Sequence, residues 1–281
     1  MADGAYRWQG HAPAPDAARI EAIDAAYDEA GAHAFAEPAR AAAVERLEAA
    51  LVAARAGDLP EAVSRLAEAR SVLERLNPDA LEPRRGMAGL FDSRNKRLRA
   101  FRESFRSASA ALSDAASDLA GRVEDAARRS GALDAVWTEI RDAMVEMDAH
   151  LIAAARRLSG HVAAEDAPAH PLEARKAALD ACRAAALGAL PLIRGAQNAD
   201  ARAAAALSTC RDGVDAWRQG WTEALGLSGK RPKKIRPDRE RLRRLRDELL
   251  ARIDRTLGEL TASGARRADV EARLADLRSP L

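Results

Sequence analysis

The chain has 281 residues, which is enough to build one large hydrophobic core or two small ones. Alanine fills about a quarter of the positions and aromatic residues only 4%, a composition that favours helices and excludes a sheet-rich fold. Lysine and arginine number 45 against 43 aspartate and glutamate, so the net charge of +2 indicates no class of partner by itself.

The first part of the chain predicts a short lead-in followed by helices. Residues 1–15 contain two glycines and two prolines, and we expect them to be disordered. Asp16 is placed to cap a short helix. Longer helices are expected over about 38–57 and 60–77, and the tight Gly-Asp-Leu-Pro turn between them predicts an antiparallel pair.

The centre of the chain has apolar residues at the spacing of a coiled coil. One heptad phase is apolar throughout, at positions 98, 105, 112, 119, 126, 133, 140, 147 and 154. Because a hairpin has no need to keep this phase, we favour one long helix over about 93–158, roughly 100 Å long at 1.5 Å per residue. A helical hairpin at Ser130-Gly131 is the alternative, since glycine often marks a helix end.

The second half of the chain predicts further helices and one linker. A helix from about Leu172 is expected to kink or end at Pro191, and another spans about 198–225. Residues 229–237 form a basic Pro/Gly linker, and 238–281 predict two C-terminal helices. The fold class is therefore all-α: an elongated antiparallel helical bundle over 16–228, built around the long coiled-coil-like helix or helical hairpin.

Signals for export and for membrane insertion are both missing from the sequence. The chain has two cysteines, Cys182 and Cys210, too few for a disulfide framework. Its first residues lack the apolar run of a signal peptide, and charges interrupt every Ala- and Leu-rich stretch. We therefore expect a cytoplasmic protein with reduced thiols and no transmembrane span.

No spacing of residues matches a catalytic template. The sequence has no Cys-x-x-Cys, His-Glu-x-x-His, Gly-x-Ser-x-Gly or Gly-x-Gly-x-x-Gly, and its five histidines are widely separated. We predict no catalytic, cofactor-binding or metal-binding residue. Cys182 and Cys210 have two interpretations: small buried apolar residues, or a redox pair that meets if their helices pack antiparallel.

Positive charge is concentrated in one segment. Residues 229–246 carry +8, which leaves −6 for the rest of the chain. This segment could neutralise phosphates of nucleic acid or anionic lipid, or its arginines could pair with acidic neighbours within the chain. The candidate anion-binding residues are Lys230, Arg231, Lys233, Lys234, Arg236, Arg243, Arg244 and Arg246.

One region resembles a known family. The resemblance consists of a helix stop, a Gly-x-x-Gly-x-Phe linker and a long helix that opens with aromatic residues. Through these features, roughly residues 44–158 resemble the TelA toxic-anion (tellurite) resistance family. The second half of the chain departs from the family pattern. The residues that carry the resemblance are Asn77, Pro78, Leu81, Gly86, Met87, Gly89, Leu90, Phe91, Phe105 and Leu112.

The resemblance implies a cytoplasmic, non-enzymatic protein of stress tolerance and supplies no catalytic residue. We therefore expect an interaction or scaffold protein that acts through protein partners; a second copy of the chain is one candidate partner. Met87, Leu90 and Phe91 either fill the junction before the long helix or form a docking plug for a partner. The alternatives are a polyanion-binding module that uses residues 230–246 and a thiol-based redox protein.

Overall fold

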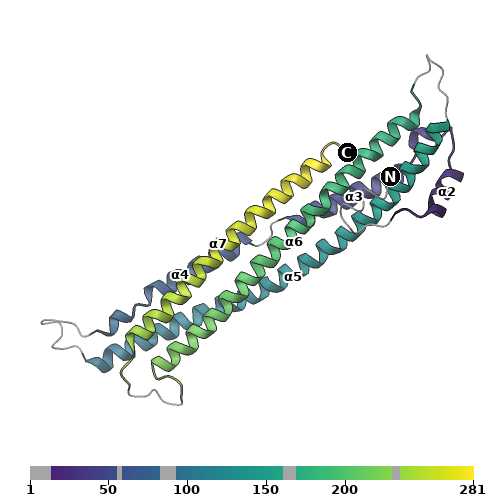
Figure 1. The fold of residues 1–281 in the computed structure, drawn as a ribbon. Coiled ribbons are helices and arrows are strands. Elements are labelled where there is room, and N and C mark those ends of the chain that lie inside the picture. The colour runs from purple at the N-terminus through teal and green to yellow at the C-terminus, as the bar shows by residue number, and fades with distance from the viewer. Residues whose placement is uncertain (1–13, 56–58, 83–92, 161–168, 230–234) are drawn as a thin grey trace. The chain divides into compact units, whose positions relative to one another are not determined.

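The computed structural model confirms the all-α fold class. It describes residues 14–55, 59–82, 93–160, 169–229 and 235–281, and these residues form helices and no strand. The predicted lead-in, most of the basic linker and the predicted docking plug of Met87, Leu90 and Phe91 lie outside the described residues. Figure 1 shows the helices α2 (Ala17–Ala25), α3 (Glu37–Ala54), α4 (Leu59–Arg75), α5 (Arg94–Gly160), α6 (Pro171–Ala224) and α7 (Arg239–Arg278), with short 3-10 helices η1 (Ala32–Ala34) and η2 (Pro78–Leu81).

Local sequence signals explain several helix ends. The Asp16 carboxylate accepts a hydrogen bond from the Ala18 amide at 3.0 Å, so the predicted cap of α2 is confirmed. The Ser93 hydroxyl caps α5 in the same way, accepting from the Lys96 amide at 3.1 Å. Asn77 ends the α4 segment and caps η2 through the Asp79 amide.

α5 is one helix of 67 residues, so the long helix is confirmed and the hairpin at Ser130-Gly131 is not formed. Two predicted helix ends are wrong. α6 does not end at Pro191 but continues through it, although proline removes a backbone hydrogen bond from the helix. α7 is a single helix of 40 residues where we expect two.

The chain forms two compact units, and α5, α6 and α7 contribute residues to both. Unit 1 comprises Met1–Arg55, Arg129–Asn198 and Arg266–Leu281, and unit 2 comprises Ala56–Arg128 and Ala199–Ala265. α3 packs in the core of unit 1 and α4 in the core of unit 2. The predicted antiparallel pair of these two helices is therefore wrong, because each helix buries its apolar stripe against other partners.

Unit 2 packs four helical segments around an aromatic cluster. Phe101 and Phe105 of α5 contact Trp217 and Trp221 of α6, with ring centroids 5.5–5.8 Å apart. All four rings are buried. α6 runs antiparallel to α5, since Arg102 contacts Leu225 and Ser113 contacts Arg218. α6 also runs antiparallel to α7, where Thr209 contacts Arg252 and Glu223 contacts Arg241. α4 runs antiparallel to α7, because Arg70 contacts Asp254 and Asp79, just after α4, contacts Arg243.

Unit 1 packs more alanine into its core. Small residues allow close approach between its helices: Leu277 of α7 lies 3.2 Å from the position that a Cβ on Gly188 of α6 would occupy. One buried ion pair, between Asp148 of α5 and Arg183 of α6, links two helices of this core. The largest buried side chains of the cluster include Leu47, Leu133, Ile140, Met144, Met147 and Ile193.

Candidate functional site

Both cysteines are buried on a single helix. Cys182 and Cys210 lie on α6, in the cores of unit 1 and unit 2 respectively. About 42 Å of helix separates them at 1.5 Å per residue. Of the two interpretations, small buried residues is the one that the structure confirms, and the two thiols do not lie on separate antiparallel helices. Burial raises the pKa of the Cys182 thiol and raises that of Cys210 to about 11, so both stay protonated and poorly nucleophilic at neutral pH.

The structure pairs most of the described arginines of the basic segment with carboxylates. Arg243 Nε donates to the Asp79 carboxylate at 2.9 Å and Arg243 Nη1 to the Glu240 carboxylate at 2.5 Å. Asp79 and Glu240 together raise the pKa of Arg243. Arg246 lies 2.9 Å from Asp247. Intramolecular pairing, one of the two interpretations of this segment, thus holds for Arg243 and Arg246.

Two further arginines of α7 also bind acidic residues of unit 2. Arg239 pairs with Glu82, and Arg241 donates to Glu223 at 2.9 Å. Arg244 is exposed and lies 3.9 Å from Glu248, at the limit of an ion pair. Arg236 is exposed, and Lys230, Arg231, Lys233 and Lys234 lie outside the described residues.

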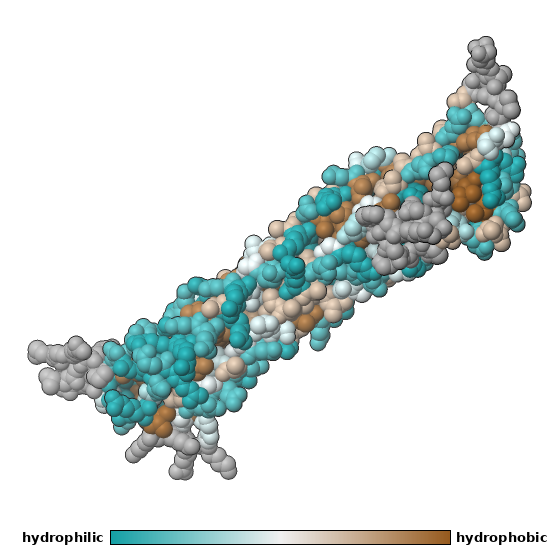
Figure 2. Space-filling model, viewed as in Figure 1, coloured by the Kyte–Doolittle hydropathy of each residue, from teal (hydrophilic) through white to brown (hydrophobic). Residues whose placement is uncertain are grey.

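The structure places a second basic segment beside the predicted one. Arg94 Nη2 at the start of α5 donates to the Ile235 carbonyl at 3.1 Å. The first turn of α5 has no acidic residue, and Lys96 and Arg99 are exposed in the first two turns. We use the term basic end for the surface formed by Arg94, Lys96, Arg99 and Arg236. Hydrophilic residues make up most of the coloured surface near the starts of α5 and α7, with a few hydrophobic residues among them (Figure 2).

Arg102 fixes the end of α6 next to the basic end. Its guanidinium donates twice to the Leu225 carbonyl, at 3.0 and 2.6 Å. Gly226 then adopts a left-handed conformation, with φ of 66°, and the helix closes through hydrogen bonds from Gly226 to Glu223 and from Leu227 to Thr222. Burial and the nearby Arg106 lower the pKa of Arg102.

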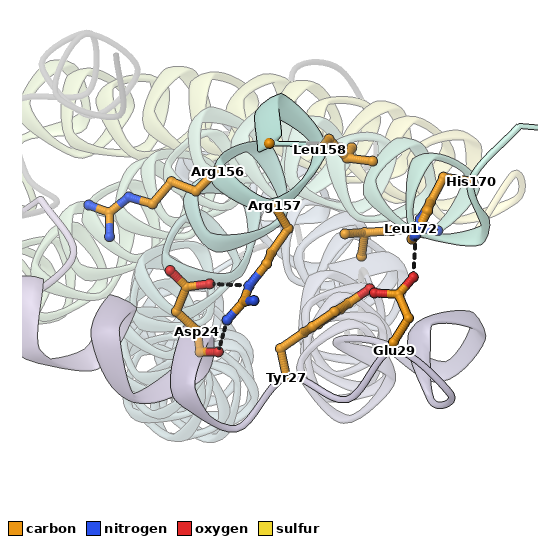
Figure 3. A pocket seen from close by; sticks show the side chains of 9 residues that line it. Asp24, Tyr27, Glu29, Arg156, Arg157, Leu158, His170 and Leu172 are labelled. Atoms are coloured by element: carbon orange, nitrogen blue, oxygen red, sulfur yellow. Dashed lines mark hydrogen bonds and ion pairs between the residues drawn. The ribbon is translucent and has the colours of Figure 1, made fainter. Parts of the chain in front are cut away.

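A polar pocket of about 410 Å³ lies in unit 1, among residues that the sequence analysis does not select. Figure 3 shows Arg157 between Asp24 and Tyr27: Arg157 Nε donates to the Asp24 carboxylate at 2.7 Å, and the guanidinium lies 5.1 Å from the centre of the Tyr27 ring. His170 contacts the Glu29 carboxylate at 2.5 Å. Burial and the Glu29 carboxylate raise the pKa of Tyr27.

These contacts give the pocket a structural role. They attach the end of α2 and the segment after it to the end of α5 and to the residue before α6, and they pair the charges of Arg157 and Asp24. No sequence signal could have grouped these residues, because Asp24 and Arg157 are 133 positions apart. Within the described part of the chain, no group of three or more His, Cys, Asp and Glu side chains is arranged to hold a metal ion.

The chain matches no protein-family model, no curated protein and no solved structure. Among the described helices, none combines the length and the apolar character that a bilayer crossing requires.

Proposed function

We propose that the protein is a non-enzymatic helical interaction protein similar to the TelA toxic-anion (tellurite) resistance family. In this proposal it acts in the cytoplasm and contributes to stress tolerance by binding protein partners. The proposal combines the sequence resemblance with the arrangement of the helices that carry it.

The continuous α5 is the observation that carries the proposal. The resemblance implies a helix stop followed by a long helix with aromatic residues near its start. α4 ends just before Asn77-Pro78, and α5 then runs unbroken from Arg94 to Gly160 with Phe101 and Phe105 in its first four turns. Both rings pack in the core of unit 2, which gives them a structural role in forming the bundle.

The positions of the two thiols favour binding over thiol chemistry. A dithiol mechanism needs two sulfur atoms within bonding reach, and at least one of them must ionise readily. Cys182 and Cys210 are buried in different cores, and burial raises the pKa of each.

Survival in the presence of tellurite tests the proposal. The chain is expressed in a tellurite-sensitive bacterium, and the concentration that stops growth is compared with that of cells that carry an empty vector. We expect the chain to raise this concentration, and the double variant Cys182→Ala/Cys210→Ala to protect equally well. Leu112→Asp, which places a charge in the core of unit 2, serves as the unfolded control.

Two results would contradict the proposal. One is the absence of protection by a chain that accumulates in folded form, as judged by its helical circular dichroism. The other is loss of protection in a folded Cys182→Ala/Cys210→Ala variant, which would show that protection depends on the thiols.

A further inference from the structure

Several acidic residues near the basic end are bound by arginines of α7. Asp79 pairs with Arg243, Glu82 with Arg239, and Glu223 with Arg241. These carboxylates therefore contribute little negative potential to the surrounding surface. Two other acidic residues lie beside the basic end: Glu103 pairs with Arg106 of α5, and Asp238 accepts a hydrogen bond from the Arg241 amide.

The four cations of the basic end form no recorded ion pair. Among the residues that the structure describes, no carboxylate lies within ion-pair distance of Arg94, Lys96, Arg99 or Arg236. The one recorded side-chain contact of Arg94 is to the neutral Ile235 carbonyl. Three of the four residues are arginines, whose planar guanidinium matches the geometry of a phosphate group.

We infer that the basic end binds the phosphate backbone of double-stranded nucleic acid without reading its sequence. This activity goes beyond the proposed function and does not depend on it. The charge comes from two segments that are distant in sequence, the start of α5 and the residues before α7, which Arg94 joins at Ile235. A charged surface of this kind recognises phosphates through electrostatic attraction and the release of counterions.

The surroundings of the basic end favour a duplex over other polyanions. Single-stranded nucleic acid is bound by stacking its bases on aromatic side chains, but the described aromatic residues of unit 2, Phe101, Phe105, Trp217 and Trp221, are all buried in its core. Insertion into a lipid surface uses exposed apolar side chains, and Leu98 and Leu242 near the basic end also point into that core. Among the described exposed neighbours, Asn95 and Ser104 are polar and Ala100 carries only a methyl group.

Duplex binding by the purified full-length chain tests this inference. Fluorescence anisotropy of a labelled DNA duplex of about 25 base pairs is followed as the protein is added, at several salt concentrations. Contact with four phosphates predicts a slope of log K against log salt near −3.6, or about a 100-fold loss of affinity between 50 and 200 mM salt.

Charge reversal at the basic end is the decisive comparison. We expect the triple variant Lys96→Glu/Arg99→Glu/Arg236→Glu to bind at least about 10-fold more weakly at low salt and to flatten the slope by about 3. The matched control Arg156→Glu/Arg202→Glu/Arg255→Glu changes the net charge equally, at exposed arginines elsewhere. The control should bind within about 2-fold of the unmodified chain if binding depends on position.

Glutamate in the first turn favours α5, so the triple variant should fold at least as well, as circular dichroism would show.

Three outcomes would overturn the inference: no duplex binding at low salt, equal losses in the two triple variants, or basic-end-dependent binding to phosphatidylserine vesicles without binding to the duplex. The last outcome would assign the surface to a membrane. If duplex binding fails while tellurite protection persists, the inference is wrong and the proposed function stands.

Discussion

In each unit, an arginine from another helix satisfies carbonyl groups at the end of a long helix. Arg102 donates to Leu225 at the end of α6, and Arg267 donates to Ala53 at 2.9 Å and to Arg55 at 2.6 Å at the end of α3. Helix C-termini carry partial negative charge and unpaired carbonyls, so a guanidinium at this place stabilises the helix. Arg267 is fully buried, which makes its contacts hard for water to replace.

Replacing Arg267 with methionine should therefore destabilise the protein. The variant keeps much of the side-chain volume but leaves the two carbonyls without this donor, and we expect a loss of about 2 kcal/mol in the free energy of unfolding. Urea denaturation followed by circular dichroism measures the change. Arg255→Met, at an exposed position of α7, is the control and should change stability by less than about 0.5 kcal/mol. Equal stability of the two variants would show that Arg267 does not act as a cap.

Glu37 connects pH to the stability of unit 1. Its carboxylate binds Arg40 and Arg175, and these two guanidinium groups lower the pKa of Glu37 to about 2. Because the folded-state pKa lies below the ordinary value, the stabilisation is complete above about pH 4.5 and is lost as the pH falls towards 2. The side chain is 42% exposed, so solvent screening limits its contribution to about 1 kcal/mol or less.

The variant Glu37→Gln should be less stable than the unmodified protein at pH 7 and equally stable near pH 2. Denaturant midpoints measured at a series of pH values give the difference between the two proteins. High salt should reduce the difference at pH 7, since the ion pairs are partly exposed. A difference that stays constant across this pH range would mean that packing, and not charge, causes the effect.

At the scale of the helices, α5 remains continuous at Gly131, a residue with low helix propensity. It is exposed, and no atom outside its own helix lies within 4 Å of the position where a Cβ would stand. Glycine inside a helix costs about 1 kcal/mol relative to alanine, and the apolar contacts of Leu133 and Ile140 nearby offset this cost.

Gly131→Ala should raise the free energy of unfolding by about 0.5–1 kcal/mol. The opposite result is expected for Gly226→Ala, because Gly226 has φ of 66° and its new Cβ would stand 3.0 Å from Ile235. That variant should lose about 1 kcal/mol or more. Thermal unfolding of both variants measures the contrast, and a destabilising Gly131→Ala would indicate that α5 needs a flexible point there.

Some helix boundaries follow from the local sequence, and others depend on packing between helices. The heptad phase predicted the continuity of α5 because each of its apolar positions is buried. Pro191 predicted a break in α6, yet Leu190, Leu192 and Ile193 are buried around it, and this burial offsets the lost hydrogen bond. The turn after α3 indicated where one helix stops, but nothing local indicates which helices α3 and α4 pack against.

The partners of the charged residues in the basic segment could not be predicted from local sequence either. Its charge is evident in the sequence, but the partner of Arg243 is Asp79, 164 positions away. Likewise, only the contact between Arg94 and Ile235 shows that the cations of α5 join those before α7. The sequence therefore indicated an anion-binding segment without indicating which of its arginines are already neutralised.

At the scale of the whole molecule, three helices belong to both units. α5, α6 and α7 each contribute to the core of unit 1 and to the core of unit 2. A helix that unfolds in one unit loses cooperative hydrogen bonds at its entry into the other, so we expect the two units to unfold together.

Alanine substitutions in the two cores test this coupling. Leu112→Ala in unit 2 and Met144→Ala in unit 1 remove fully buried side chains, and each should cost about 2–5 kcal/mol. We expect each variant to show one thermal transition, with the same midpoint by circular dichroism and by tryptophan fluorescence. Two separate midpoints in either variant would show that the units unfold independently.

The continuity of α5, α6 and α7 also restricts how the length of this protein can change during evolution. Inserting a single residue into α5 rotates every apolar position beyond it by about 100° around the helix axis, which breaks the one heptad phase that runs from position 98 to position 154. An insertion of seven residues makes nearly two full turns and keeps that phase. Relatives with a longer or shorter α5 should therefore differ from this chain in steps of a heptad.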